Sequence, residues 1–345
     1  MMGTILEREP FLDKPFVSVI IPVRNEIKYI SQCLNALLNQ DYPSNHMEVL
    51  LVDGMSDDGT RDVLVKYGSK FDNSRVLDNP ARFVPSAMNI GISNAKGDII
   101  VRVDSRCIVS QDYISQCVNY LRKTGADNVG GLQRPIGDCY VKKLIQLATT
   151  SRFGIGNSKF RYSQKEQFVE TVYLGAYRRE VFHKIGLYDE SLIRNQDYEL
   201  NHRLIMAGGK IYFTPKIRSS YHGRPSLRKL WWQYFQYGFW KVRVIWKHPK
   251  SIKIRQIVPP LFVLILSSTI VLSLSTTNWL FLSGLAFIYG GPALIASFYA
   301  SRRLGWRYML LLPVVFAILH LSWGLGFWWS LLILPFHFKR APGTS

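Results

Sequence analysis

Two aspartates stand directly after short apolar runs rich in β-branched residues. Asp53 follows EVLLV, and Asp104 follows DIIVRV. In an open α/β sheet, ligands bind outside the carboxyl ends of the strands, so we expect both carboxylates at a ligand-binding edge. A further acidic pair, Asp197 and Glu199, opens a segment whose composition is typical of a helix start. Aspartate is also a common turn and helix-capping residue, so each acid taken alone is compatible with a structural role.

The segments around these acids alternate between strand and helix patterns. Strand patterns cover 16–22, 48–52 and 98–103, and helical patterns follow at 27–38, near 60 and at 85–95. This alternation predicts a mostly parallel sheet with helices on both faces. Neither GxGxxG nor GxxxxGK[ST] occurs, which disfavours a dinucleotide-binding dehydrogenase and a P-loop ATPase.

Charge divides the chain into two different parts. The 345 residues carry 43 Lys and Arg against 24 Asp and Glu, a net charge of +19. Positions 221–345 hold 14 of the basic residues and no Asp or Glu, which leaves 29 basic and 24 acidic residues in 1–220. A nucleic-acid-binding protein needs the positive surplus on its recognition domain, so we expect no nucleic-acid partner.

The basic part contains three long apolar runs, at 257–277, 279–300 and 308–336. No charged side chain occurs from 257 to 301. Each run is long enough to cross a hydrocarbon core of ~30 Å. We therefore expect a transmembrane region over 257–338.

Short basic loops predict the orientation of these runs. Basic residues lie before the first run, at 241–255, and between the second and third, at 302–307, whereas the turn at 277–279 is neutral. The positive-inside rule then predicts a multi-pass plasma-membrane protein with a cytoplasmic catalytic domain. The charged start, MMGTILEREPFLDKP, agrees, because it lacks a signal peptide's apolar core. Lys339 and Arg340 leave open whether the third run crosses the membrane or is re-entrant or interfacial.

A basic amphipathic segment at 223–256 links the domain at 1–222 to the apolar runs. Its large apolar side chains recur at helical spacing among basic residues: Leu227, Leu230, Trp231, Tyr234 and Phe235. This pattern predicts an interfacial helix on anionic headgroups.

Four motifs in order, VSVIIPVRNE, EVLLVDGMSDDGT, AMNIGISNAKGDIIVRVDSR and NQDYELNHRL, resemble the family 2 glycosyltransferases. NQDYELN and LRKLWWQYFQYG are similar to the ExoA-like succinoglycan-biosynthesis branch of that family. The resemblance covers nearly the whole chain and implies the GT-A fold, a Rossmann-like α/β nucleotide-sugar-binding domain. It also implies inverting transfer of one sugar from a nucleotide-diphosphate donor, commonly UDP-linked such as UDP-glucose, to an acceptor hydroxyl.

The resemblance also implies a nucleotide-binding site. Pro22, Arg24 and Glu26 would border the nucleotide, and Asp53 would hydrogen-bond the base, commonly uracil. Glu26 alternatively fits a helix N-terminal acid that is favoured by the helix dipole.

Asp104 matches the first acid of the family's metal-binding DxD, where Mg²⁺ or Mn²⁺ would bridge the donor phosphates. The second acid is replaced by Arg106, which cannot ligate a cation. Either Asp104 keeps the metal together with phosphate oxygens and His222, or the guanidinium of Arg106 itself binds phosphate in a bidentate manner. We favour the retained metal. Arg106 also fits a surface residue that points away, and His222 a loop histidine with a structural hydrogen bond.

Asp197 matches the family's general base, which deprotonates the acceptor hydroxyl. It also fits an N-terminal helix cap, and Glu199 is the alternative base. Gln196 replaces an acid that many relatives carry, so Asp197 has no adjacent carboxylate before it. Arg203 fits either a phosphate contact or an ion pair with a carboxylate.

These observations predict a membrane-anchored glycosyltransferase whose acceptor is a polyprenyl-diphosphate-linked glycan in exopolysaccharide or related synthesis. Membrane anchoring would raise the effective concentration of a lipid-borne acceptor. Two rivals remain. A processive synthase would carry QxxRW, which does not occur here, and an inactive scaffold is suggested by Arg106.

Overall fold

The structure, a computed structural model, describes residues 14–337, with side chains through 333. The charged N-terminal start, Lys339 and Arg340 therefore lie outside the described residues. The chain divides into two compact units. Unit 1 comprises the residues up to Gly131 together with Lys165–Tyr188 and Arg203–Ser219, and unit 2 comprises Leu132–Gln164, Asp189–His202 and the residues from Ser220 onward.

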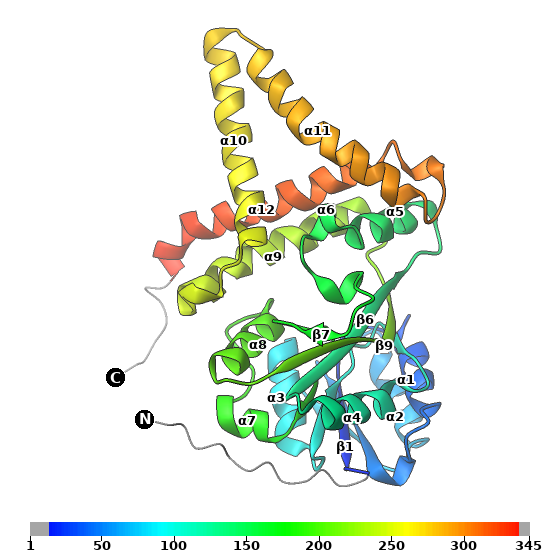
Figure 1. The fold of residues 1–345 in the computed structure, drawn as a ribbon. Helices are drawn as coiled ribbons and strands as arrows, with labels where there is room; N and C mark the ends of the chain where they lie inside the picture. Colours follow the sequence, from blue (N-terminus) through cyan, green and yellow to red (C-terminus); the bar gives the residue numbers. More distant parts are fainter. Residues whose placement is uncertain (1–13, 338–345) are drawn as a thin grey trace. The chain divides into compact units, whose positions relative to one another are not determined.

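Four parallel strands form one half of the sheet of unit 1, in the order β3-β2-β1-β4. Their bounds are β1 Val17–Val23, β2 Met47–Asp53, β3 Ser74–Asp78 and β4 Ile99–Arg102, and the helices between them are α1 Ile30–Leu38, α2 Thr60–Gly68 and α3 Val84–Asn94. Every residue of β1 and β2 is buried, as expected for strands covered by helices on both faces. Alternating strands and helices thus confirm the predicted α/β architecture (Figure 1).

The other half of the sheet is mixed, so the prediction of a mostly parallel sheet holds only through β4. The order continues β4-β8-β6-β9-β5, with β7 paired to β9. The pairs β4–β8, β6–β8 and β7–β9 are antiparallel. The bounds are β5 Cys107–Val109, α4 Tyr113–Thr124, β6 Asn128–Ile136, β7 Gln167–Phe168, β8 Ala176–Arg178, α7 Glu180–Ile185 and β9 Ile211–His222. Strand–helix–strand connections continue after β4, as in β5–α4–β6, but β8 lies between β4 and β6 and runs antiparallel to both.

Unit 2 is mainly helical. Its elements are α5 Tyr140–Thr149, α6 Arg152–Ile155, η2 Lys159–Arg161, α9 Leu227–Lys247, η3 Pro249–Ser251, α10 Ile254–Thr276, α11 Leu280–Ser301, η4 Trp306–Tyr308 and α12 Leu312–His337, and α8 Gln196–Met206 begins in it. Three of these helices are long and apolar enough to span a membrane: α10, α11 and the 312–333 portion of α12. Their bounds lie within a few residues of the predicted apolar runs.

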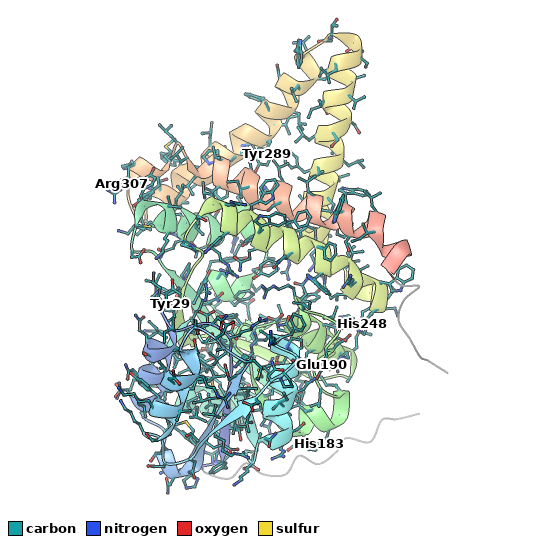
Figure 2. The ribbon with its side chains drawn as sticks, turned by 180° about the vertical axis from the view of Figure 1, so that it is seen from behind. Tyr29, His183, Glu190, His248, Tyr289 and Arg307 are labelled. Carbon is teal, nitrogen blue, oxygen red and sulfur yellow. The ribbon has the colours of Figure 1, made fainter. Side chains whose placement is uncertain are left out.

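The helices α10 and α11 form a hairpin (Figure 1). Only 17% of the apolar window in α10 and 11% of that in α11 is buried, and their side chains project outward from both helices (Figure 2). Lipid tails are a suitable environment for such a surface. The window in α12 is 39% buried, because α12 packs against other helices of the unit.

Glycines allow α12 to lie directly against α9, and Figure 1 shows the two helices side by side. A Cβ on Gly238 would lie 1.9 Å from the carbonyl oxygen of Trp323. A Cβ on Gly326 would lie 2.0 Å from the carbonyl oxygen of Phe235. The backbones therefore meet without intervening side chains, as in membrane helix pairs built on small residues.

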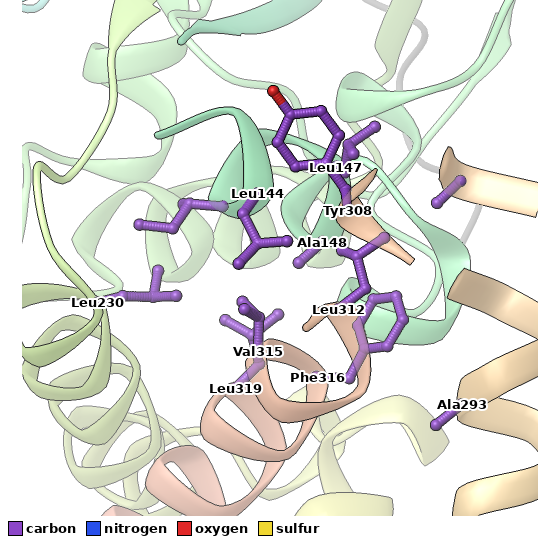
Figure 3. Close-up of a cluster of buried hydrophobic side chains, with 12 residues drawn as sticks. Leu144, Leu147, Ala148, Leu230, Ala293, Tyr308, Leu312, Val315, Phe316 and Leu319 are labelled. Carbon is purple, nitrogen blue, oxygen red and sulfur yellow. The ribbon is translucent and has the colours of Figure 1, made fainter. Parts of the chain in front are cut away.

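An apolar cluster joins α12 to α5, α9 and α11 (Figure 3). Leu230 of α9 is 1% exposed within it, and Leu227 and Tyr234 pack against it. Part of the apolar stripe predicted to face the membrane surface thus contacts protein. Trp232 and Trp246 of the same helix are exposed.

Candidate functional site

The parallel strands bring the predicted carboxylates to one edge of the sheet in unit 1. Val23, Asp53 and Asp78 occupy the same register position at the ends of β1, β2 and β3. The N–H of Val103 donates to the carbonyl of Ile20, so β4 follows β1 up to the residue before Asp104. The sequence expectation that Asp53 and Asp104 share the carboxyl edge agrees with this topology.

Asp53 is fully buried, and residues close to it in sequence bind its carboxylate. The hydroxyl of Ser56 donates to Oδ1 at 2.6 Å, and Nη1 of Arg61 lies 3.1 Å from Oδ2. The same Nη1 lies 2.6 Å from the carboxylate of Asp78, and these two bonds raise the pKa of Arg61, with the Asp78 bond the larger cause. Because Asp53 is buried, a nucleotide base could reach its carboxylate only after side chains around it moved, and the side chain of Arg61 is 43% exposed.

The loop after β1 is tied to the loop after β2. Asn25 adopts a left-handed conformation with φ of 53°, and its backbone N–H donates to Ser56 Oγ at 3.0 Å. The N–H of Glu26 donates to Thr60 Oγ1 at 2.8 Å. Pro22 is buried within β1, whereas Arg24 is exposed at the start of the loop. Arg24 is thus the most accessible of the residues predicted to border the nucleotide.

Two protein groups already hold the carboxylate of Asp104. Arg102 Nε lies 2.8 Å from Oδ1, and the hydroxyl of Tyr173 donates to Oδ2 at 3.1 Å. Cys107 Sγ lies 3.0 Å from the same hydroxyl. Burial, followed by the charge of Asp104, raises the pKa values of both Cys107 and Tyr173, so both stay protonated at neutral pH. Asp104 is therefore oriented as a carboxylate that is 28% exposed.

Arg106 and Glu26 meet as an ion pair. Nε of Arg106 donates to both carboxylate oxygens of Glu26, at 2.7 and 2.8 Å. The guanidinium also lies 5.2 Å from the ring centroid of Tyr29. The carbonyl of Glu26 accepts from the N–H groups of Tyr29 and Ile30, so Glu26 also stands at the entry to α1, and the helix-start alternative remains open. The sequence predicted both residues for one site but not their bond.

No group of three or more His, Cys, Asp or Glu that could hold a metal occurs among the described residues. Asp104 is the carboxylate that remains for a cation in the DxD position, because Arg106 replaces the second acid. A carboxylate accepts at about four lone-pair sites, so the bonds from Arg102 and Tyr173 leave capacity for a ligand. Magnesium is commonly bound by one or two carboxylates plus substrate phosphates, and Asp104 fits that pattern. His222 ends β9 in unit 2 and is half-buried.

Asp197 is the second residue of α8 and is half-buried in unit 2. Its Oδ1 accepts the backbone N–H of Tyr198 at 2.8 Å, a bond within the first turn. Asn195, with φ of 62°, reverses the chain immediately before the helix, and its amide donates to the carbonyl of Tyr237 on α9 at 3.0 Å. The start of α8 is thereby attached to α9.

Three further contacts fix the first turn of α8 to the helices that follow it. The hydroxyl of Tyr198 donates to the carbonyl of Ser251 at 2.7 Å. Lys241 Nζ, 2% exposed as a residue, lies 3.5 Å from the ring centroid of Tyr198. Glu199 Oε1 pairs with Nε2 of His248, labelled in Figure 2, at 2.9 Å. Glu199, the alternative base, is thus 2% exposed and paired.

Arg203, on the same helix, donates to backbone carbonyls near the end of α7. Its Nη2 donates to the carbonyl of Leu187 at 2.7 Å, and its Nη1 donates to the carbonyl of Ile185. These carbonyls lie at the end of α7, where basic side chains commonly satisfy the last helical turn. The two roles expected for Arg203 did not include this one.

Comparison with known proteins assigns the fold and family. Residues 18–186 match glycosyl transferase family 2. The chain is 31% identical to the succinoglycan biosynthesis protein ExoA of Rhizobium meliloti over 320 residues, which is 91% of this chain and 94% of that protein. The chain belongs to glycosyl transferase family 2. The family confirms the resemblance noted in the sequence and makes the protein a glycosyltransferase.

Two other relatives extend the comparison. The chain is 33% identical, over 65% of its length and 72% of the other's, to a Methanococcus voltae dolichyl N-acetyl-alpha-D-glucosaminyl phosphate 3-beta-D-2,3-diacetamido-2,3-dideoxy-beta-D-glucuronosyltransferase. The mannosyltransferase PcManGT of Pyrobaculum calidifontis, solved with GDP-Man and Mn²⁺, aligns with a TM-score of 0.58 at 19% identity, covering 89% of this chain and 87% of that one. This structural likeness confirms the GT-A fold.

The residues missed by sequence reasoning share one property. Tyr173, Lys241 and His248 each contact a predicted site residue, or its direct neighbour, from a distant part of the chain. Local patterns carry no signal for such contacts, because they depend on how the elements pack. A lysine and a histidine within a basic amphipathic stretch are instead typical of a solvated helix face.

Proposed function

We propose that this glycosyltransferase is membrane-anchored and transfers one sugar, with inversion, from a nucleotide-diphosphate sugar to a hydroxyl of a polyprenyl-diphosphate-linked glycan. A UDP-linked donor such as UDP-glucose is our first candidate. The observation that carries the proposal combines two features of one family 2 chain. A strand-end carboxylate is held in position, and the helix of Asp197 is attached to α9, which packs against the apolar helix α12. The similarity to ExoA and to an enzyme named for a dolichyl phosphate substrate supports a lipid-borne acceptor in exopolysaccharide or related glycan synthesis.

In the proposed reaction, Asp197 accepts the proton of the acceptor hydroxyl as that oxygen bonds to the sugar's anomeric carbon. The bond from the anomeric carbon to the donor diphosphate breaks, and the diphosphate keeps the electron pair. Oδ1 of Asp197 accepts the Tyr198 N–H, which holds the carboxylate in one orientation and leaves Oδ2 for the proton. General bases of this kind contribute about 10²- to 10⁴-fold to the rate.

The donor end of the proposal rests on unit 1. Arg24, Asp53 and the Glu26–Arg106 pair would border the nucleotide, and Pro22 would shape the floor beneath it. Asp104, held by Arg102 and Tyr173, would ligate Mg²⁺ or Mn²⁺ with phosphate oxygens, and His222 is the additional ligand that we propose. Such a cation, when bound, neutralises charge that develops on the leaving diphosphate. Because Arg106 is bonded to Glu26, we favour Asp104 over Arg106 as the group that acts at the phosphates.

For the membrane we propose that α10 and α11 cross it and that α12 lies in the interface beside α9. The basic loops before α10 and after α11 support a cytoplasmic position for the catalytic domain. The close backbone contacts of Gly238 and Gly326 join α12 to α9. Because α9 is basic and amphipathic, the pair suits a headgroup environment better than a hydrocarbon one.

The test is donor-dependent nucleotide release by the full-length protein in nanodiscs, with a panel of UDP- and GDP-sugars and a polyprenyl-diphosphate-linked glycan. We expect release to require one donor, the lipid acceptor and Mg²⁺ or Mn²⁺, and to stop with EDTA. Asp197→Asn should lower kcat by at least 10²-fold. Asp62→Asn, on an exposed helix position in α2, is the matched control and should change kcat by less than twofold. An active Asp197→Asn enzyme would contradict the assignment of the base.

A further inference from the structure

The loop between α5 and β7 is strongly basic and contains an arginine in an unusual environment. The loop, residues 150–166, carries four Lys and Arg and a single acid, Glu166. Arg161 closes the short helix η2 in this loop. No role in the proposed donor site or in proton transfer has been assigned to it.

Aromatic side chains, rather than carboxylates, surround the guanidinium of Arg161. Its Nη1 donates to the hydroxyl of Tyr221 at 2.8 Å. Its central carbon lies 5.6 Å from the ring centroids of both Tyr221 and Phe160. Tyr234 and Tyr237 of α9 act on the same charge electrostatically. Burial opposes the charge, yet the surrounding tyrosine oxygens raise the pKa of Arg161 overall, so the group stays protonated.

The aromatic groups do not neutralise this charge. Burial raises the pKa of Tyr234, so its phenol is neutral at physiological pH. Among the described residues, no carboxylate forms an ion pair or hydrogen bond with Arg161. A guanidinium carries five N–H donors, and a partly desolvated one without an anion is costly. The remaining donors therefore favour an anion that is supplied by a ligand.

The loop is attached to the apolar helices of the same unit. Phe153 packs edge-on against Phe316 of α12, with ring centroids 5.0 Å apart. Nε2 of His320 donates to the carbonyl of Phe153 at 2.9 Å. Arg255, in the first turn of α10, donates through Nη1 to the carbonyl of Asn157 at 2.7 Å. The loop therefore lies beside α12 and the first turn of α10, which we propose to be at the membrane surface. An anion that reaches the loop from the membrane would be carried at that surface.

We propose that Arg161 and the hydroxyl of Tyr221 bind the diphosphate of the polyprenyl carrier that bears the acceptor glycan. This inference rests on the proposed function, because it assigns a second substrate group to the same enzyme. Arginine suits the role, since its planar fork matches two phosphate oxygens. The ring contacts hold that fork in one orientation before the lipid arrives.

The test measures binding rather than turnover. Geranylgeranyl diphosphate is titrated into the full-length protein in zwitterionic nanodiscs, and UDP and GDP are titrated separately. Loss of charged hydrogen bonds worth about 1.5–3 kcal/mol corresponds to a 10- to 100-fold rise in Kd. We expect this rise for Arg161→Gln with the lipid diphosphate and no change with the nucleotides. Tyr221→Phe should raise the lipid Kd by a few-fold, and Arg161→Lys should give an intermediate value.

Arg228→Gln, which removes an exposed arginine at the start of α9, is the matched control and should leave the lipid Kd within twofold. An equal loss in Arg228→Gln would show attraction by surface charge and would overturn the proposal. So would a loss of nucleotide binding in Arg161→Gln, which would assign the arginine to the donor, or full competition by phosphatidylglycerol in the nanodisc. If Arg161→Gln does not fold, the Tyr221→Phe and Arg161→Lys titrations decide by the same criteria.

Failure of this inference is distinguishable from failure of the proposed function. Asp197→Asn should bind geranylgeranyl diphosphate like the unmodified protein, because the base is not part of the binding group. Active enzyme in which Arg161→Gln leaves the lipid Kd unchanged would refute the diphosphate site alone. Binding that depends on Arg161, in a protein that releases nucleotide from no donor, would refute the transferase assignment alone.

Discussion

Replacing Tyr173 by Phe tests whether Asp104 is a metal ligand that the protein holds in position. The hydroxyl of Tyr173 donates to Asp104 Oδ2 at 3.1 Å. Because burial raises the pKa of Cys107, its thiol keeps its proton and can donate to the oxygen of Tyr173, 3.0 Å away. Tyr173→Phe removes the middle member of this chain. It leaves the bond from Arg102 to the other carboxylate oxygen intact.

The size of the effect follows from these contacts. A hydrogen bond to a charged group contributes about 1.5–3 kcal/mol, and we take about 1–2 kcal/mol, because Asp104 is partly exposed and keeps Arg102. This corresponds to about a 5- to 30-fold weaker metal affinity. Partners that orient metal-binding carboxylates commonly have effects of ~10- to 100-fold. We expect the Mn²⁺ concentration for half-maximal activity to rise by about 5- to 30-fold. The kcat at saturating Mn²⁺ should change less than twofold.

The assay is nucleotide release over a Mn²⁺ titration, with Tyr120→Phe as the matched control. Tyr120 also donates a hydrogen bond to a carboxylate in unit 1, that of Glu166, but neither residue belongs to the proposed site. An unchanged Mn²⁺ requirement in Tyr173→Phe would refute the reasoning. An equal shift in Tyr120→Phe, or activity that persists in EDTA, would refute it as well.

Three other predictions concern stability and topology. Glu48 is 4% exposed and accepts from Ser18 Oγ and Arg75, so its pKa lies below the ordinary value despite its burial. Its ionised form therefore stabilises the fold above the unfolded-state pKa of about 4.5, and this contribution is lost as the pH falls through the lower folded value. Acid unfolding of Glu48→Gln should accordingly show a weaker pH dependence in that range, and an unchanged profile would contradict this account. Gly326→Ala should lower thermal stability in detergent by about 1–3 kcal/mol, since its Cβ would meet a carbonyl oxygen of α9, whereas Gly284→Ala, with open space around it, should not. A reporter fused to the C-terminus should be cytoplasmic if α12 lies beside α9, and a reporter on the opposite side would show a third crossing.

The sequence predicted the half of the fold that is built from local repeats. The strands ending at Asp53 and Asp104 were placed to within about a residue, because buried parallel strands are short apolar runs followed by turn residues. The strand Ser74–Asp78 was not predicted, since none of its residues is buried and it lacks such a run. The mixed half of the sheet depends on pairing between distant segments, for which local patterns give no register.

For the site residues too, local sequence predicted the positions but not the contacts between distant segments. Asp104 was assigned from its position after a strand, but its orientation by Tyr173 joins residues 69 apart in sequence. Arg106 was left open between phosphate binding in place of a metal and a surface position, and its bond to Glu26 spans 80 residues. Pairing of this kind is decided by packing and is invisible to motif spacing.

The attachment of α8 to the segment that follows β9 limits how the enzyme can be simplified. A soluble fragment is commonly sought by deleting the apolar part of a membrane enzyme, and a cut before α9 would keep Asp197 and every predicted donor-site residue. It would, however, remove four residues that contact the start of α8: Tyr237, Lys241, His248 and Ser251. Such a fragment would keep Asp197 but lose the contacts that fix the start of its helix. If Asp197 is the base, as we propose, the segment from α9 onward would therefore support catalysis in addition to its proposed role at the membrane.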